Sequence, residues 1–448
     1  MNSPDSISRR GFLSKTLAGA GAGLVLGTPH LLSAAPSNAG GKIHIALVGM
    51  GKQGRVLFEA MSNIPGLHFQ AVCDIWDYNL KSGVAKVRAL QGHTPKGYTD
   101  IDDMLSKEKG LDAVVIATPD FWHSPHTVKC LEAGLHVYCE KMMSNTIDGA
   151  REMVKAMEKT GKLCQIGHQR RSNPRYRFTL NRLINGEKIC GQITNANGQW
   201  NRSLGASQDI GYNKKLAIDS AILTRYGYKD MHQFMNWRTY RDLSGGPISD
   251  LGAHQIDIFN WFLGGPPKTV FATGGRSYFK NREHFDNVMC LFDYDTPQGE
   301  VRAFYQVLTT TSYGGGFYES FMGTEGSIKI SEIAASSAIY RENGAPQWDE
   351  LVERGFLVRQ PAPPKPESTA GAVASYESVA PEVFGLPGGF AKPAHQPHLE
   401  NFFDAVRGDG KLRCDARHAF ESEAPIFWVN PSAFSGQPIH LKSEHLSV

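Results

Sequence analysis

Two different periodicities divide the chain near residue 167. Before it, short runs that are mostly apolar, such as residues 43–48 and 113–117, alternate with amphipathic stretches. Apolar strands of four to six residues that alternate with helices are typical of a parallel, doubly wound sheet, which is buried on both faces. The pattern therefore predicts an α/β domain over residues 41–166.

After residue 167 the apolar runs become longer, and apolar residues alternate with polar ones. The segments with this pattern are QITNANGQWNRS, KTVFATGGRSYF, NVMCLFDYD and EVRAFYQVLT. A period of two predicts antiparallel strands with one buried and one polar face. We predict a second, α+β domain over residues 167–394. Residues 395–448 then predict a helix and a tail that pack back near the domain junction.

The composition is that of a globular protein with a sizeable core. Of the 448 residues, 41% are hydrophobic and 20% are charged, which is ordinary for a chain of two domains. The 47 Lys and Arg residues nearly balance the 44 Asp and Glu residues. A balanced chain has no electrostatic reason to bind nucleic acid or an anionic membrane, so we predict neither partner.

Residues 1–39 predict an export signal. Arg9 and Arg10 precede a weakly apolar run of Ala, Gly and Leu. This run is too short and too rich in glycine to anchor the chain stably in a bilayer, and the segment resembles a bacterial twin-arginine signal cleaved after Ala39. Such a signal implies that the protein folds in the cytoplasm and is exported, folded, to the periplasm.

The seven cysteines predict neither a disulfide framework nor a zinc site. Their number is odd, they are widely spaced, and the sequence has no CxxC pair. Most lie in apolar runs, so we expect buried free thiols.

A glycine-rich loop, GMGKQG, follows the first predicted strand. Gly49 permits a tight turn, Gly51 lets a pyrophosphate approach the backbone, and Gly54 lets the next helix pack closely on the strand. The second strand ends at Asp74, whose carboxylate would bind the adenosine ribose hydroxyls and repel a 2′-phosphate. No cation follows Asp74 directly, so the pattern favours NAD over NADP.

Two further strand ends carry polar residues. Thr118 and Pro119 follow one strand, and Glu140 and Lys141 follow the next. Ligands of doubly wound sheets bind beyond the carboxyl ends of the strands, so we expect these residues at the rim of an active site. His123 lies near the same rim or caps the following helix. The predicted cofactor-binding residues are Gly49, Gly51, Lys52, Gln53, Gly54, Asp74, Thr118, Pro119, His123, Glu140 and Lys141.

The segment GGPISDLGAHQIDIFNWF, residues 245–262, predicts a helix with one apolar stripe. Asp250, His254 and Asp257 fall on another stripe, at spacings of four and three. A carboxylate beside an imidazole fixes its tautomer and raises its basicity, as a general base requires. A structural histidine and a metal site are the alternatives. Because no third ligand lies nearby at metal spacing, we predict no metal.

These motifs together resemble the family of glucose-fructose oxidoreductase, inositol dehydrogenase and MocA. The ordered set is the glycine-rich loop, Asp74, ATPDFWH, AGLHVYCEK and GGPISDLGAHQID, over residues 42–257. The resemblance implies an NAD-dependent enzyme with a Rossmann domain and a C-terminal α+β domain built on an open, mostly antiparallel sheet. It also implies pairing through that sheet into a homo-oligomer, a dimer or a tetramer.

The resemblance further implies roles for individual residues. Lys141, Asp250 and His254 would meet at the nicotinamide, where Lys141 stabilises or shifts protons on a substrate hydroxyl and His254 takes the hydroxyl proton. Glu140 would orient Lys141 or bind the cofactor. Met142 stands where the family usually has proline.

Amides, cations and aromatic residues in the second half predict a carbohydrate or glycoside substrate. Trp237 or Tyr226 would stack on a sugar face, while Arg238 and other polar side chains would bind hydroxyls. The predicted substrate-binding residues are Gln169, Arg170, Trp237, Arg238 and Asp257.

Export restricts the reaction, because NAD(H) is not supplied outside the cytoplasm. The compatible chemistry keeps NAD tightly bound and returns the hydride within each cycle. Such a cycle can hydrolyse a glycoside through transient oxidation, usually at C3, followed by elimination, addition of water and reduction. The C2 proton then needs a base, either His254 or a tyrosine such as Tyr226 or Tyr228. The predicted catalytic residues are Lys141, Asp250, His254 and Tyr226.

Two alternatives to glycoside hydrolysis remain. One is a sugar or polyol oxidoreductase that passes its hydride to a second substrate, as in glucose-fructose oxidoreductase. The other is an NAD- or sugar-binding protein without turnover. Met142 in place of proline favours the non-catalytic alternative, whereas the combination of Lys141, Asp250 and His254 argues against it.

Overall fold

The computed structural model describes residues 41–361 and 380–448. The predicted export signal therefore lies outside the described residues.

The first half of the described chain forms a six-stranded sheet in which every pair of neighbours is parallel. The strand order, β3-β2-β1-β4-β5-β6, is that of a dinucleotide-binding Rossmann domain. The strands are β1 (Ile43–Val48), β2 (Leu67–Cys73), β3 (Lys96–Tyr98), β4 (Ala113–Ile116), β5 (His136–Cys139) and β6 (Cys164–Ile166). The predicted parallel α/β domain is confirmed.

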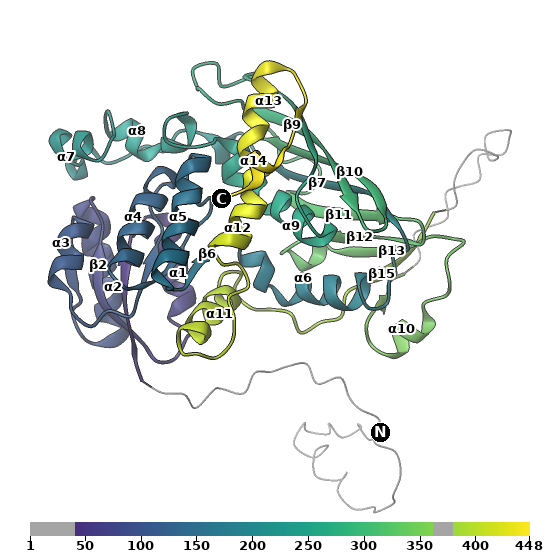
Figure 1. The fold of residues 1–448 in the computed structure, drawn as a ribbon, viewed down its shortest axis with the longest axis horizontal. Helices are drawn as coiled ribbons and strands as arrows, with labels where there is room; N and C mark the ends of the chain where they lie inside the picture. The colour runs from purple at the N-terminus through teal and green to yellow at the C-terminus, as the bar shows by residue number, and fades with distance from the viewer. Residues whose placement is uncertain (1–40, 362–379) are drawn as a thin grey trace, which may run out of the picture. The chain divides into compact units, whose positions relative to one another are not determined.

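Helices cover both faces of this sheet (Figure 1). They are α1 (Lys52–Met61), α2 (Asp77–Gln91), α3 (Ile101–Lys107), α4 (Asp120–Glu132) and α5 (Ile147–Thr160). Alternate residues of β1 enter two separate cores: Ile45 and Leu47 pack with residues of α1, whereas Ala46 and Val48 pack with residues of α5. Burial on both faces explains why these strands carry runs of adjacent apolar residues, such as residues 45–48 and 113–116, rather than apolar residues at every second position.

The second half forms a ten-stranded sheet with the order β14-β15-β13-β12-β11-β7-β10-β9-β8-β16. Its pairs are antiparallel except β7 with β10, so the predicted mostly antiparallel sheet is confirmed. The strands are β7 (Ile193–Asn201), β8 (Thr269–Gly275), β9 (Asn287–Thr296), β10 (Gly299–Leu308), β11 (Phe317–Gly323), β12 (Gly326–Ile330), β13 (Ala338–Arg341), β14 (Val358–Arg359), β15 (Glu382–Gly385) and β16 (Ile439–His440).

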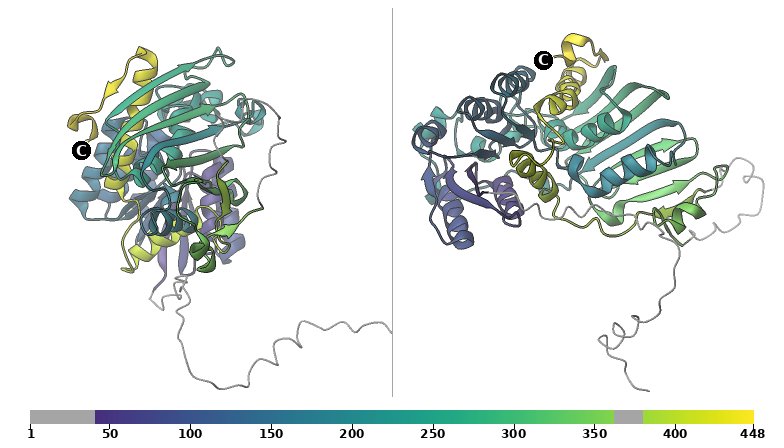
Figure 2. Two further views of the ribbon diagram at one scale, coloured as in Figure 1. Left: turned by 90° about the vertical axis from the view of Figure 1, so that its right-hand side faces the viewer. Right: turned by 60° about the horizontal axis from the view of Figure 1, so that its bottom comes forward.

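One face of the ten-stranded sheet is buried and the other is open. Val288 and Phe292 of β9 are buried, while the intervening Leu291 is 50% exposed. Helices α9 (Ala253–Leu263) and α13 (Val429–Ser435) cover the buried face. The left view of Figure 2 looks onto the uncovered strands.

The last fifty residues return to the first half of the chain. Helix α11 (Gln396–Val406) packs on α1, and its Phe402 and Phe403 complete the core beneath β1. Helix α12 (Ala416–Glu423) contacts both α5 and α9, so it joins the two sheets (Figure 1). The remaining helices are short: α6 (Pro174–Phe178), α7 (Ser220–Arg225), α8 (Met231–Met235), α10 (Asp349–Glu353) and α14 (Ser443–Leu446).

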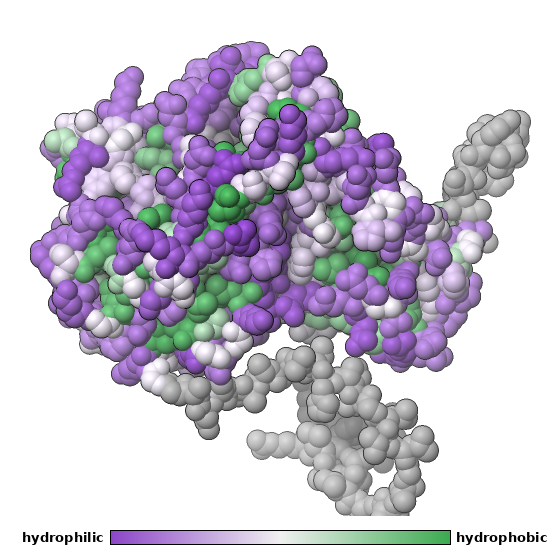
Figure 3. Space-filling view, viewed as in Figure 1, coloured by the Kyte–Doolittle hydropathy of each residue, from purple (hydrophilic) through white to green (hydrophobic). Residues whose placement is uncertain are grey.

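Hydrophilic residues cover most of the face drawn in Figure 3, and hydrophobic residues form separate patches there. Within residues 41–361 and 380–448, no helix is both long enough and apolar enough to cross a membrane. All seven cysteines lie in the described part of the chain, and each is a buried free thiol, as the sequence predicts.

Candidate active site

The glycine-rich loop leaves open space in front of α1. Gly49 has φ +88°, and a Cβ on Gly54 would lie 1.9 Å from the Gly49 carbonyl oxygen, so both positions require glycine for the chain itself. A Cβ on Gly51 would meet nothing within 4 Å. Helix α1 has no side-chain cap, so its first N–H groups point into this space. A free helix N-terminus beside an unfilled glycine suits a pyrophosphate group.

Asp74 lies beside the loop, directly after β2. Its carboxylate accepts hydrogen bonds from the backbone N–H groups of Met50, at 2.7 Å, and Trp76, at 2.8 Å. Burial raises the pKa of Asp74 to about 6, although these hydrogen bonds act in the opposite direction. The group is mostly ionised at neutral pH and held in place, as binding of ribose hydroxyls requires. The loop and Asp74 therefore fit NAD.

Lys141 and Asp250 meet as predicted, but through the backbone of Asp250. Lys141 Nζ donates a hydrogen bond of 2.5 Å to the Asp250 carbonyl oxygen. Asp250 lies in a π-helical turn, Ile248–Gly252, that leads directly into α9. The hydrogen bond thus joins the end of β5 to the start of α9. The Lys141–Met142 peptide bond is cis.

The Asp250 carboxylate is surrounded by cations. Arg238 Nε donates to Oδ1 at 2.8 Å, and Arg202 lies 3.8 Å from Oδ2. Although burial has the largest single effect and favours the neutral acid, the charges of Arg238, Lys141 and Arg202 together lower the pKa of Asp250. The carboxylate is therefore ionised at every pH at which the protein would work.

His254 lies one turn after Asp250 and packs against Trp200, with ring centroids 5.5 Å apart. Its Nδ1 is buried without a hydrogen-bond partner among the described residues. Burial, and then the charge of Lys141, lowers the pKa of His254 well below its usual value. His254 is therefore neutral at pH 7, and its basicity is lowered, whereas the sequence predicted that a neighbouring carboxylate would raise it.

The predicted row of Asp250, His254 and Asp257 on an open helix face is wrong. Helix α9 is buried on nearly all sides, and Asp257 is 1% exposed. Asp250 pairs with Arg238, and Asp257 pairs with Arg171 at 2.8 Å. Each carboxylate faces an arginine from outside the helix instead of the histidine within it.

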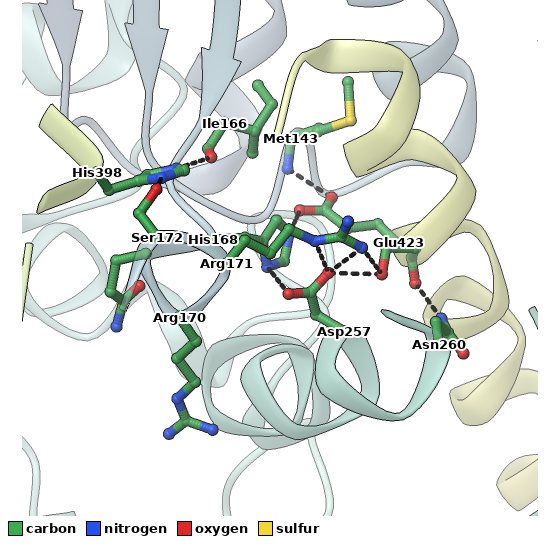
Figure 4. Close-up of polar contacts among 12 residues, drawn as sticks. Met143, Ile166, His168, Arg170, Arg171, Ser172, Asp257, Asn260, His398 and Glu423 are labelled. Carbon is green, nitrogen blue, oxygen red and sulfur yellow. Dashed lines mark hydrogen bonds and ion pairs between the residues drawn. The ribbon is translucent and has the colours of Figure 1, made fainter. Parts of the chain in front are cut away.

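A buried polar network lies behind the site (Figure 4). Glu423 of α12 accepts a hydrogen bond from the Met143 N–H at 2.7 Å with one oxygen, and contacts His168 Nε2 at 2.7 Å with the other. His168 Nδ1 lies 3.7 Å from Asp257, so the network reaches α9. Because Met143 follows Lys141 by two residues, Glu423 holds the segment that carries Lys141.

Two more predicted cofactor residues have partners in the protein. Gln53 Nε2 lies 3.1 Å from Glu140 Oε1 and 3.0 Å from His395 Nε2. His123 is buried, and its two ring nitrogens contact the carbonyl oxygens of Thr118 and Met142, each at 2.6 Å. His123 therefore links the two strand-end segments.

Four predicted substrate or catalytic residues lie away from Lys141 or have their polar groups at least partly occupied. Arg170, 1% exposed, pairs with Glu319 and Glu332, and Gln169 donates to Glu332. Arg170 Nη2 and Gln169 Oε1 are buried without a partner among the described residues, so each residue is only partly engaged. The Tyr226 hydroxyl donates to the Thr99 carbonyl at 3.0 Å and contacts Asp100. Both residues directly follow β3, the edge strand of the parallel sheet. The residues that the structure does not bring to Lys141 as free groups are Gln169, Arg170, Tyr226 and Asp257.

Trp237 is largely buried, and the Arg238 guanidinium lies over its ring at 4.2 Å. This stacking leaves no free face for a sugar on that side of Trp237. Arg238 itself borders the site, as predicted, because it pairs with Asp250.

The sequence places Asp120, the first residue of α4, at the same strand end as Thr118 and Pro119, but no role was predicted for it. Burial raises the pKa of Asp120 to about 7, against the opposing effect of Lys141 and Arg238. A carboxyl group that titrates near neutrality beside a lysine is suited to proton transfer. Its position in ATPDFWH, directly after Thr118 and Pro119, could have indicated it. No group of three potential metal ligands occurs in the described residues.

We predict opposite outcomes for alanine at two glycines. Gly54→Ala should destabilise the fold by about 1–3 kcal/mol, because its Cβ has no room. Gly51→Ala should leave the melting temperature unchanged and weaken NAD binding at least tenfold, because the added methyl group fills the space proposed for the pyrophosphate. Scanning calorimetry measures the stability of both variants, and titration calorimetry measures their affinity for NAD. Equal NAD affinity in wild type and Gly51→Ala would contradict this placement.

Asp120 should make stability depend on pH. Its pKa is about 7 in the folded protein and near 3.8 when exposed, so the folded state binds the extra proton between pH 4 and pH 7. Stability from this group is therefore lost as the pH rises through that window. Asp120→Asn should gain stability relative to wild type over the same range, as urea unfolding at several pH values would show. The exposed Asp242→Asn is the control, and a difference independent of pH would contradict the assignment.

Removal of the Glu423 carboxylate should lower the free energy of unfolding. Glu423→Ala leaves the Met143 N–H and His168 without their partner in a fully buried place, at a cost of about 3 kcal/mol in unfolding free energy. Glu421→Ala, on the exposed side of the same helix, should change stability by less than about 0.5 kcal/mol. Urea unfolding compares the two variants. Equal losses of unfolding free energy would show that the buried contacts of Glu423 do not stabilise the fold.

Comparisons with known proteins agree with this architecture. Residues 43–168 match the Oxidoreductase family, NAD-binding Rossmann fold, and residues 217–441 match the Oxidoreductase family, C-terminal alpha/beta domain. The WlbA dehydrogenase of Bordetella pertussis, solved with NADH and UDP-GlcNAcA, has the same fold. Its TM-score is 0.63 at 19% identity, over 90% of this chain and 99% of that one.

Two curated relatives differ in their names. A 2,7-anhydro-N-acetylneuraminate hydratase of Mediterraneibacter gnavus is 27% identical over 64% of this chain and 66% of its own length. A glycosyl hydrolase family 109 protein of Shewanella baltica is 29% identical over 36% of this chain and 39% of its own length. The matches thus span less than two thirds of either relative. The two matched domains, which cover most of the sequence, show that the chain belongs to the Gfo/Idh/MocA oxidoreductase family and is an NAD-dependent enzyme.

Proposed function

We propose that this enzyme hydrolyses glycosides through a redox-neutral cycle in which tightly bound NAD is reused in place. The observation that carries the proposal is the hydrogen bond between Lys141 and the Asp250 carbonyl, which brings an ammonium group, the neutral His254 and the titratable Asp120 to one end of the parallel sheet. Such a group can move protons on and off a sugar hydroxyl. Its two acids, Asp120 and Asp250, differ from the carboxylate pair of ordinary glycosidases, because Arg238 engages the Asp250 carboxylate at 2.8 Å.

The chain's own residues have distinct tasks in this cycle. Bound NAD would supply an acceptor for one hydride from the sugar and would return it at the end. Lys141 stabilises the C3 oxygen as it becomes a carbonyl oxygen, and His254, being neutral, takes the hydroxyl proton. Asp120 has a pKa of about 7, so its carboxyl group can release or take up a proton near Lys141 at neutral pH.

Once C3 is a ketone, the C2–H bond is acidic. A base removes the C2 proton, the electron pair forms the C1–C2 double bond, and the C1 substituent leaves with a proton. Water then adds across that double bond, and reduction of C3 restores the sugar. Of the bases that the sequence suggests, His254 is the one we retain, since the Tyr226 hydroxyl is engaged with Thr99 and Asp100. His254 acts on C2 only after it has released the hydroxyl proton to water.

Two further considerations support the proposal. The sequence pattern of residues 1–39 favours export to the periplasm, where a cycle without net consumption of NAD has an advantage. One relative is named as a glycosyl hydrolase and another as a hydratase of a sugar derivative. We also propose that the chain forms a homo-oligomer through the open sheet face, where Phe271, Met289 and Leu291 are exposed.

The test is to purify the protein without added nucleotide, measure bound NAD(H), and incubate it with aryl glycosides and free sugars. Repeated release of phenol without net nicotinamide reduction supports hydrolysis. Stoichiometric reduction on free sugars, with reoxidation only after a second carbonyl compound is added, would instead make the protein a sugar oxidoreductase. NAD binding without either reaction would make it a binding protein.

Lys141→Gln should lower turnover about 10²- to 10⁴-fold, the usual contribution of one positioned proton-transfer group. NAD affinity should change little, because the glycine-rich loop and Asp74 are untouched. Lys129→Gln, which removes a surface ion pair with Asp102, is the matched control. If Lys141→Gln turns over at the wild-type rate, Lys141 has no part in the mechanism.

A further inference from the structure

Three cations act on the Asp250 carboxylate: Lys141, Arg202 and Arg238. Asp250 in turn acts on the buried Asp120, whose pKa is about 7. The cavity beside Asp250 is lined by three arginines, Arg202, Arg238 and Arg282, and by three aspartates, Asp209, Asp250 and Asp286. Whether an arginine there can bind an anion therefore depends on which of these groups already have partners.

The two guanidinium groups have unused hydrogen-bonding capacity. Arg238 uses Nε for Asp250, and its side chain is 45% exposed. Arg202 has one ionic contact among the described residues, 3.8 Å to Asp250 Oδ2, and is 35% exposed. A guanidinium group has five N–H donors, and the contacts above occupy only part of them.

A cavity of about 130 Å³ adjoins both arginines. The other charged groups in its wall are already satisfied: Arg282 pairs with Asp209 at 2.6 Å, and Asp286 accepts the N–H groups of Tyr278 and Phe279. Its volume equals that of roughly four water molecules, enough for a carboxylate and the atoms next to it. Arg202 and Arg238 are therefore the groups left to bind a ligand there.

We propose that the substrate is a carboxylated sugar whose carboxylate binds between Arg202 and Arg238, next to Asp250. This inference rests on the proposed action on sugars and names the substrate class. Guanidinium groups bind carboxylates through two parallel hydrogen bonds, which a neutral sugar hydroxymethyl group cannot make. Arg238 pairs with the Asp250 carboxylate at 2.8 Å and offsets its charge, so it offers the ligand only its remaining N–H groups. Arg202 lies 3.8 Å from Asp250 and supplies the charge that the ligand carboxylate would balance.

The test measures binding rather than turnover. The NAD-loaded full-length protein is titrated calorimetrically with matched pairs of free sugars: glucuronate and glucose, galacturonate and galactose. At least one acid should bind ten times more tightly than its neutral partner, and the preference should shrink at high salt. No preference in either pair, including no binding at all, would overturn the proposal. Tighter binding of glucose 6-sulfate than of the acids would overturn the choice of a carboxylate.

Variants at the arginines sharpen the result. Arg202→Gln should lower affinity for the acid at least tenfold and leave affinity for the neutral sugar unchanged, whereas Arg202→Lys should restore part of the loss. Arg302→Gln, on the open face of the sheet, is the control. If Arg202→Gln does not fold, Arg202→Lys decides: it keeps the charge but not the paired donors, so affinity equal to wild type would overturn the proposed pairing.

The outcome separates this inference from the proposed hydrolysis. If an acid binds in an Arg202-dependent way but its aryl glycoside releases no phenol, the proposed hydrolysis is contradicted and the proposed acidic ligand is supported. Phenol release from neutral glycosides without any preference for acids would do the opposite.

Discussion

The arrangement of the site depends on the need to satisfy buried carboxylates at the junction of the two sheets. Glu423 and Asp257 are almost fully removed from water, where an unpaired charge costs several kcal/mol. Glu423 meets this need with the Met143 N–H and His168, and Asp257 with Arg171. Met143 follows β5, while His168 and Arg171 follow β6. Since Asp257 belongs to α9 and Glu423 to α12, these hydrogen bonds tie the ends of two strands of the parallel sheet to two helices at the junction.

Two acids near Lys141 show how the surroundings divide the chemistry. Arginines keep Asp250 ionised, and burial brings the pKa of Asp120 to about 7. The Asp250 carboxylate can thus position the neighbouring cations, while Asp120 gains and loses a proton. Environments that separate the pKa values of neighbouring acids are a common basis of acid–base catalysis.

The sequence predicted most of the fold but only part of the site. Glycine spacing and strand periodicity are local signals, and they located the Rossmann domain and the strands around β9. The proximity of Lys141 to Asp250 followed only from the resemblance to a known family, and the structure shows it through the backbone of Asp250. Periodicity also placed Asp257 beside His254, but it could not reveal that Arg171 faces Asp257 from elsewhere. Glu423 and His395 were missed because their partners lie hundreds of residues away, and no local pattern records such contacts.

The ten-stranded sheet also has a consequence for solubility. Both of its edges end in strands of two residues, β14 and β16. A long exposed edge offers a row of unpaired backbone groups to any other extended chain, whereas two residues offer too few hydrogen bonds to hold a newcomer. A sheet this wide can therefore leave one face uncovered without inviting the edge-to-edge growth that leads to aggregation.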